Sequence, residues 1–196
     1  MIFEYPMTAI PDYQAFMLPV LLSIKDGKEH SNTEIYGQIA SSFNLSEKEL
    51  NHMLPSGVQS TYENRVGWAK TYLKKAGLVT TPSRGKVKIT ERGLSVLRQN
   101  PSKIDAKFLE QFPEFLDFKG FRANKQSKND DNIDESENEL TPQEILENSY
   151  QDLRNKLAHE LLVQVMNSSP EFFERLVIDL LVAMGYGGSR SEAGKR

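Results

Sequence analysis

Residues 61–100, with the sequence TYENRVGWAKTYLKKAGLVTTPSRGKVKITERGLSVLRQN, decide the fold that this chain predicts. Helical periodicity runs from about Tyr62 to Lys75 and ends before Gly77, a residue type that commonly follows a helix. Two short β-type segments then flank the turn at 82–85, and Thr90 begins a closing helix. With shorter helices expected before residue 56, this segment predicts a winged helix-turn-helix in a mainly α chain with a small β wing.

The helices before residue 56 are recognised by their start signals. Pro11 and Asp12 open a helix to about Ile24, in which Pro19 is expected to cause a kink. The sequences SNTE at 31–34 and SEKE at 46–49 are capping boxes, in which a serine and a glutamate satisfy free backbone donors at a helix start.

The segment is basic within an acidic chain. Between Pro55 and Asn100, nine Lys and Arg residues stand against two acids, whereas all 196 residues carry a net charge of −3. A local charge of about +7 favours an anionic partner, and duplex DNA is the partner that a winged helix predicts.

One side of the 62–75 helix is apolar and the other is polar and basic. Two polar residues of that outward side are expected to reach base edges: Asn64 and Thr71. Three lysines of the same side are expected on phosphates: Lys70, Lys74 and Lys75. The wing would add Arg84, Lys86 and Lys88 along the backbone or minor groove. Arg65 falls on the inward side of the helix, where we expect it to form a structural ion pair. For the basic residues as a group, the alternative to DNA binding is an ordinary solvated surface.

Composition excludes several other classes. No cysteine is present, so thiolate metal sites and disulfides are excluded, and the three histidines are dispersed. No glycine-rich phosphate loop or nucleophile elbow occurs. The longest apolar stretch is too short to span a bilayer and the N-terminus lacks a signal peptide, so we expect a cytoplasmic protein without membrane contact.

The second half of the chain predicts a different organisation. The stretch KQSKNDDNIDESENE at 125–139 has few apolar residues and is expected to be a linker. We therefore predict a winged-helix domain at 8–121, an acidic linker at 122–140 and a helical part at 141–196. Leucines spaced by three and four residues between Leu146 and Leu161 are expected to pack within the chain, with the seam of a homodimer as the alternative.

Two segments resemble a known family. YENRVGWAKTYLKKAGLV with SRGKVKITERGLSVL resembles the N-terminal domain of the Mrr restriction endonucleases, and SPEFFERLVIDLLVAMGYGGS resembles the start of their catalytic domain. The resemblance implies a cytoplasmic nuclease that cleaves foreign, methylated DNA with a PD-(D/E)xK-type fold and a divalent metal such as Mg²⁺. It also implies that Glu174 is the catalytic-domain glutamate near that metal.

The sequence departs from the family pattern at the catalytic motif. An aspartate followed on the next strand by (E/Q)xK is needed to hold the metal, and this motif does not occur before Arg196. We therefore expect the DNA-recognition part of a truncated Mrr-like endonuclease, which binds DNA, uses no Mg²⁺ by itself and does not cleave. The alternative is a winged-helix transcription regulator that dimerises through its C-terminal helices, and a third interpretation is a protein-interaction module.

Overall fold

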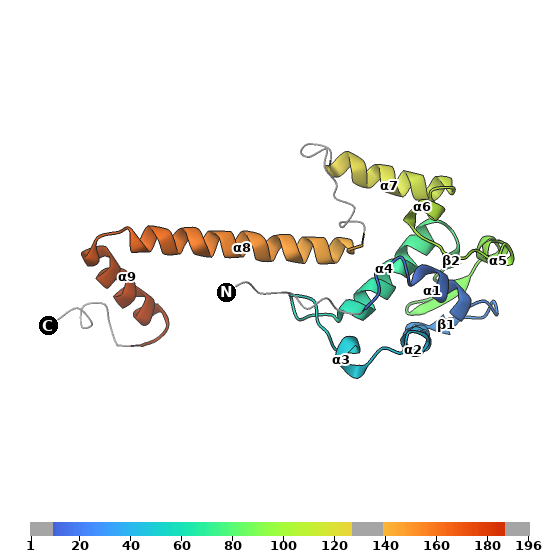
Figure 1. The fold of residues 1–196 in the computed structure, drawn as a ribbon, viewed down its shortest axis with the longest axis horizontal. Coiled ribbons are helices and arrows are strands. Elements are labelled where there is room, and N and C mark those ends of the chain that lie inside the picture. Colours follow the sequence, from blue (N-terminus) through green and yellow to red (C-terminus); the bar gives the residue numbers. More distant parts are fainter. Residues whose placement is uncertain (1–9, 127–138, 187–196) are drawn as a thin grey trace. The chain divides into compact units, whose positions relative to one another are not determined.

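The computed structural model describes residues 10–126 and 139–186 (Figure 1). Packing divides the chain into two units, Met1–Asn148 and Ser149–Arg196. The first unit contains α1 (Met17–Ser23), β1 (His30–Ser31), α2 (Asn32–Ser42), α3 (Glu47–Leu50), α4 (Thr61–Lys75), β2 (Val79–Thr80), β3 (Lys86–Ile89), α5 (Glu91–Arg98), α6 (Ala106–Leu109), α7 (Pro113–Gln126) and the first turns of α8 (Pro142–Met166). The second contains the rest of α8 and α9 (Pro170–Ala183). The predicted fold class, mainly α with a small β element, is confirmed.

The helices begin where side chains cap them. Both predicted capping boxes, at Ser31 and Ser46, are present. Ser60 and Thr90 accept from the backbone N–H groups of residues three positions later, which starts α4 and α5. After α4, Gly77 has φ 72°, a conformation that glycine adopts without strain.

Pro19 requires no kink, because the helix starts later than predicted. Residues 13–16 form turns, and α1 begins at Met17. Pro19 therefore lies in the first helical turn, where the backbone N–H has no intrahelical acceptor and its absence costs nothing.

Helix α4 is the centre of the first unit. It packs against α1, α3, α6, α7 and β2, and Val66, Ala69 and Leu73 are completely buried. Tyr72 joins four rings, those of Tyr13, Trp68, Phe115 and Phe118, with centroids 5.1 to 6.2 Å away. Because α4 is covered on most sides, little of its surface is left for a partner.

The strands form an antiparallel sheet in the order β1-β3-β2. In β3 the side chains alternate as predicted: Val87 and Ile89 are buried, whereas Lys88 is exposed. Strand β1 was missed by the sequence analysis, because two residues are too few to show an alternating pattern.

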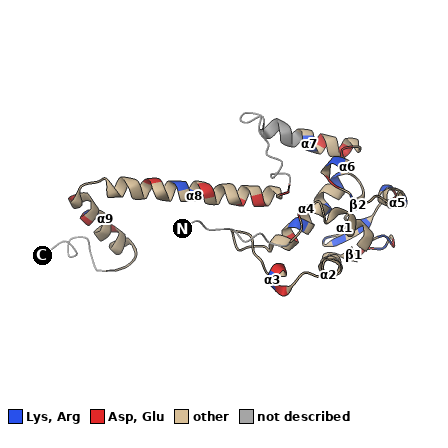
Figure 2. Cartoon of the chain, in the orientation of Figure 1, with Lys and Arg blue, Asp and Glu red and all other residues tan. Residues whose placement is uncertain are grey.

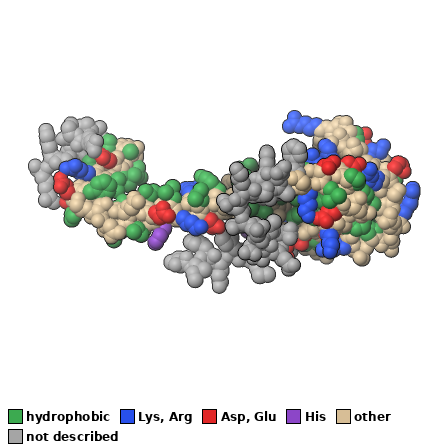
Figure 3. All heavy atoms as spheres, turned by 90° about the horizontal axis from the view of Figure 1, so that it is seen from above, with side chains coloured by type: hydrophobic (Ala, Val, Ile, Leu, Met, Phe, Trp, Pro, Cys, Tyr) green, Lys and Arg blue, Asp and Glu red, His purple; other side chains and the backbone are tan. Residues whose placement is uncertain are grey.

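The second unit is two helices with apolar surfaces. Ser169 caps α9 and Pro170 occupies its first turn, as the sequence predicts. The leucines between Leu146 and Leu161, which we call the leucine stripe, are 53% exposed at Leu161 to 68% exposed at Leu153. Packing of this stripe within the chain stays a prediction. Figure 3 shows such hydrophobic side chains on the surface of these helices. No helix in the described ranges has the length and apolar character needed to cross a membrane.

The acidic stretch lies mostly outside the described residues, and α7 continues to Gln126 at its start. The first turns of α8 pack with the first unit up to Asn148. The division into winged-helix domain, linker and helical part stays a prediction.

Candidate nucleic-acid interface

Helix α4 has a narrow band of accessible residues along one face. Its members follow one another at spacings of three and four residues, which places them on one face: Glu63, Gly67, Lys70 and Lys74. Glu63 and Lys74 are exposed and the other two are partly buried. We call this band the α4 stripe. Figure 2 shows the Lys and Arg positions of α4 beside those of the strands within the first unit.

Lys70 is held sideways from the stripe toward α2. Its ammonium donates to Asn32 Oδ1 at 2.7 Å and to Tyr36 Oη at 3.0 Å, and it lies 4.5 Å from the centroid of the Tyr36 ring. Burial lowers the pKa of Lys70 to about 8, and the nearby carboxylate of Glu63 opposes that shift. Among the ion pairs of the described residues none includes Lys70. The hydrogen-bond partners of this half-buried cation are both neutral, and Glu63 acts on it only from a distance, so an external anion in direct contact would stabilise it further.

Asn32 also ties the turn of the β2–β3 hairpin to α2. Its backbone N–H donates to Gly85 O at 3.0 Å, while its side chain accepts from Lys70. Ser31 pairs with Lys86 in the sheet. The hairpin turn and the α4 stripe consequently meet at the start of α2.

The wing cations and Lys74 face solvent. Arg84 and Lys88 are exposed and Lys86 is partly buried. Lys74 donates to Thr81 Oγ1 at 2.7 Å, which draws the end of α4 toward the hairpin. Arg84, Lys88 and Lys74 are thus accessible, and their contact with DNA stays a prediction.

One residue predicted for the outward face of α4 is buried, and two others are held by contacts within the chain. Asn64 is only 5% exposed; its side chain accepts from Thr141 Oγ1 at 2.6 Å and donates to Gln59 at 3.2 Å. The outward placement of Asn64 is wrong, because Thr141, just before α8, and Gln59 occupy its polar atoms, and in this arrangement it cannot reach a base. Lys75 is exposed, but its ammonium lies over the Phe118 ring of α7, 5.1 Å from the centroid. Thr71 is partly buried and donates to the Gly67 carbonyl within its own helix.

Arg65 forms the inward ion pair that the sequence predicts. Its guanidinium donates twice to Glu144 Oε1, at 3.0 and 2.8 Å, and again to the carbonyls of Ile10 and Pro11. The side chains of Arg65 and Glu144 are 12% and 6% exposed. Glu144 also accepts from the backbone N–H of Thr141 at 2.8 Å. We call these contacts of Asn64 and Arg65 with Thr141 and Glu144 the α4–α8 junction.

Asn32 and Tyr36 are two residues of this surface that the sequence did not predict. The capping box at Ser31 places Asn32 in the first turn of a helix, beside its free N–H groups. Tyr36 lies off the buried side of α2, which carries Ile35 and Ile39. An aromatic residue on the polar side of a helix is the sequence feature that could have indicated a contact site at Tyr36.

Comparison with known proteins shows which family the chain resembles. The model of the Mrr N-terminal domain matches residues 13–99. A curated relative, the type IV methyl-directed restriction enzyme EcoKMrr of Escherichia coli (strain K12), is 30% identical over 193 residues, which are 93% of this chain and 62% of the relative. This chain is Mrr-like. The resemblance inferred from the sequence is thus confirmed, although the chain spans less than two thirds of that relative, and no solved structure matches it.

The described residues of this Mrr-like chain do not make a metal site. Glu174 is exposed on α9, and no group of three His, Asp or Glu side chains among them could hold an ion. Mg²⁺ needs six oxygen ligands in octahedral geometry, and one exposed carboxylate does not fix them. The catalytic and metal-binding roles of Glu174 stay predictions.

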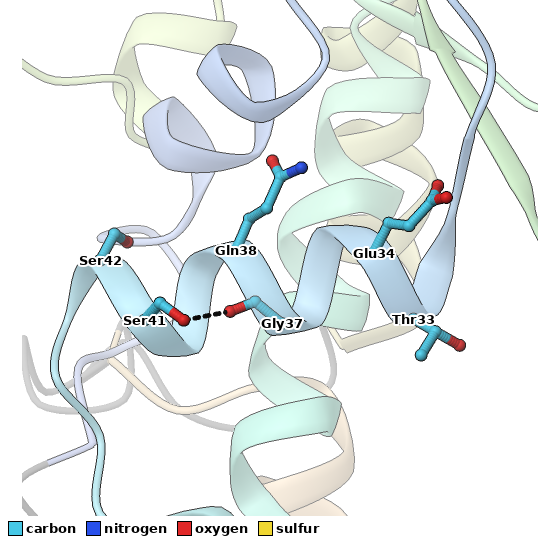
Figure 4. A pocket seen from close by; sticks show the side chains of 6 residues that line it. All are labelled: Thr33, Glu34, Gly37, Gln38, Ser41 and Ser42. Atoms are coloured by element: carbon cyan, nitrogen blue, oxygen red, sulfur yellow. Dashed lines mark hydrogen bonds between the residues drawn. The ribbon is translucent and has the colours of Figure 1, made fainter.

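A shallow depression on α2 is a poorer candidate for the interface of the Mrr-like domain. It is lined by polar and small residues of one helix, shown in Figure 4: Thr33, Glu34, Gly37, Gln38, Ser41 and Ser42. It contains no cation, and Glu34 adds a negative charge. The α4 stripe and the hairpin therefore remain the better surface for an anionic partner.

Proposed function

We propose that the first unit of this Mrr-like chain binds double-stranded DNA as a winged helix, with α4 in the major groove and the β2–β3 hairpin as the wing. The observation that carries this proposal is Lys70, a half-buried cation without a carboxylate partner among the described residues, beside the exposed Lys74 and the hairpin cations. A DNA phosphate would add a negative charge in direct contact with this ammonium, whereas Glu63 acts on it only from a distance. The order of elements, α1-β1-α2-α4-β2-β3 with α3 inserted before α4, also supports it.

We further propose that the protein serves a restriction system that cleaves foreign, methylated DNA. The support is the likeness to a relative described as methyl-directed. Binding to otherwise identical duplexes with and without methylated cytosine or adenine tests this part. Equal affinity for all of them would leave DNA binding standing and remove methylation as the basis of selection by this unit.

Two neighbouring lysines provide the test of the DNA interface. Lys74 lies on the α4 stripe, whereas Lys75 lies over Phe118. We expect Lys74→Ala to reduce the slope of log K against log salt by about 0.9, and the triple variant of Lys74, Arg84 and Lys88 by up to about 2.7, since each phosphate contact releases about one counterion.

Fluorescence anisotropy of a labelled duplex over a range of salt concentrations measures this slope. Lys75→Ala is the matched control and should leave it unchanged. An unchanged slope in the triple variant would remove α4 and the wing from the interface.

Glu174 is proposed as one carboxylate of the nuclease centre of a longer Mrr-like protein. In a protein of the relative's full length, we expect Glu174→Gln to reduce metal-dependent cleavage by about 100-fold or more, as for loss of a group that holds or orients a catalytic ion. DNA affinity should stay within a few tenths of a kcal/mol. Cleavage at the wild-type rate would show that Glu174 is only a solvated surface residue.

As a second proposal, the chain forms a homodimer through the exposed leucines of α8. This dimer would also fit the alternative function, a winged-helix transcription regulator. An apolar surface of this kind is typical of a protein contact. Sedimentation of the wild type and of a variant with Leu153 and Leu157 replaced by serine distinguishes the two states. A monomeric wild type would exclude dimerisation through these helices.

A further inference from the structure

Gly67 lies in the middle of α4 and in the middle of the α4 stripe. It has an ordinary helical backbone, without the positive φ that favours glycine at Gly77 and Gly85. Glu63 precedes it by one helical turn, and Lys70 follows with its ammonium turned toward Asn32 and Tyr36. Gly67 is partly buried and adds no side chain to this part of the stripe, while Thr71 donates to its carbonyl oxygen at 3.0 Å.

The chain itself does not need glycine at this position. A Cβ built on Gly67 would meet only Tyr36 Oη, at 3.9 Å, which is an ordinary van der Waals contact. Gly93 shows the opposite case, because a Cβ there would overlap the Leu78 carbonyl oxygen. In a helix interior glycine is less stable than alanine, since it loses more backbone entropy on folding. Folding alone would thus favour alanine at 67.

We propose that Gly67 is the point at which α4 comes closest to the base edges of bound DNA, so that a side chain at this position would hold the helix away from the groove. Glycine permits another molecule to approach the helix backbone closely. Lys74, farther along the same stripe, and the hairpin residues Arg84 and Lys88 are exposed and so available to phosphates of the same duplex. This inference rests on the proposed DNA binding and adds to it the residue that sets the depth of α4 in the groove.

The test is Gly67→Ala in the full chain, with stability and DNA affinity measured on the same protein. We expect the unfolding temperature to rise by about 2–4 °C, because alanine is the better helix former. We expect the affinity for a short duplex to fall by about tenfold or more, because a methyl group must be accommodated in a closely packed contact. Gly67→Leu should lower the affinity further, since its side chain is larger.

Gly120 provides the matched control. It lies within α7, and a Cβ there would have nothing within 4 Å. Gly120→Ala should raise the unfolding temperature by a similar amount and leave DNA affinity unchanged. If the wild type binds DNA and Gly67→Ala binds equally well, the inference is overturned while DNA binding stands. If the wild type binds no duplex, the proposed function itself fails.

Discussion

Replacing Glu144 by alanine should lower the free energy of unfolding of the first unit by about 3 kcal/mol, because it removes one partner of a buried ion pair. The guanidinium of Arg65 would lose both bonds to Glu144 Oε1. It would keep the carbonyls of Ile10 and Pro11, which is why we place the loss at the lower end of the range for buried pairs. The N–H of Thr141 would lose its acceptor as well.

Urea unfolding followed by Trp68 fluorescence measures this loss. Trp68 is the single tryptophan of the chain and belongs to α4, so its signal reports on the first unit. The control is Glu114→Ala, which breaks the ion pair between Glu114 and Arg92. The side chain of Arg92 is 42% exposed and that of Glu114 is 55% exposed. Exposed pairs contribute little, so this variant should change stability much less. Equal losses in the two variants would mean that the α4–α8 junction is not buried in solution.

Gly93→Ala should also destabilise the first unit by about 3 kcal/mol, at the upper end of the usual range for overpacking. The new Cβ would overlap the Leu78 carbonyl oxygen and lie 2.7 Å from Ile89 Cγ1. The first of these atoms belongs to the backbone and cannot rotate away. Helix α5 would therefore have to move from the strands against which it packs.

Thermal unfolding of Gly93→Ala, compared with Gly37→Ala, measures the effect. Gly37 lies within α2, and a Cβ added there would have nothing within 4 Å, so its alanine variant should be slightly more stable than the wild type. A Gly93→Ala protein as stable as the wild type would show that α5 and the strands are not so closely packed.

Several features could be predicted because they depend on residues close together in the sequence. The capping boxes of α2 and α3 join positions three residues apart. Gly77 ends α4, and the alternation of β3 places Val87 and Ile89 inside. Arg65 was also placed correctly, since the helical phase of α4 turns it away from the basic residues.

The position of Asn64 could not be predicted from helical phase. By helical phase it lies beside Thr71 and Lys75, on the side that the sequence analysis assigned to solvent. Thr141, 77 residues later, covers it and binds its side chain. A period of 3.6 residues describes one helix and contains no information about which later segment packs against it.

The sequence by itself therefore determined the helices, the hairpin, the basic segment and the Mrr-like family, because caps, turns, periodicity and motifs are local. Only the tertiary structure decided which polar side chains remain available to a partner. It placed Asn64 and Arg65 in the α4–α8 junction, turned Lys70 toward Asn32 and Tyr36, and left room for a Cβ at the partly buried Gly67. The physical reason is that burial and hydrogen-bond satisfaction depend on contacts between segments far apart in the chain, which local patterns do not specify.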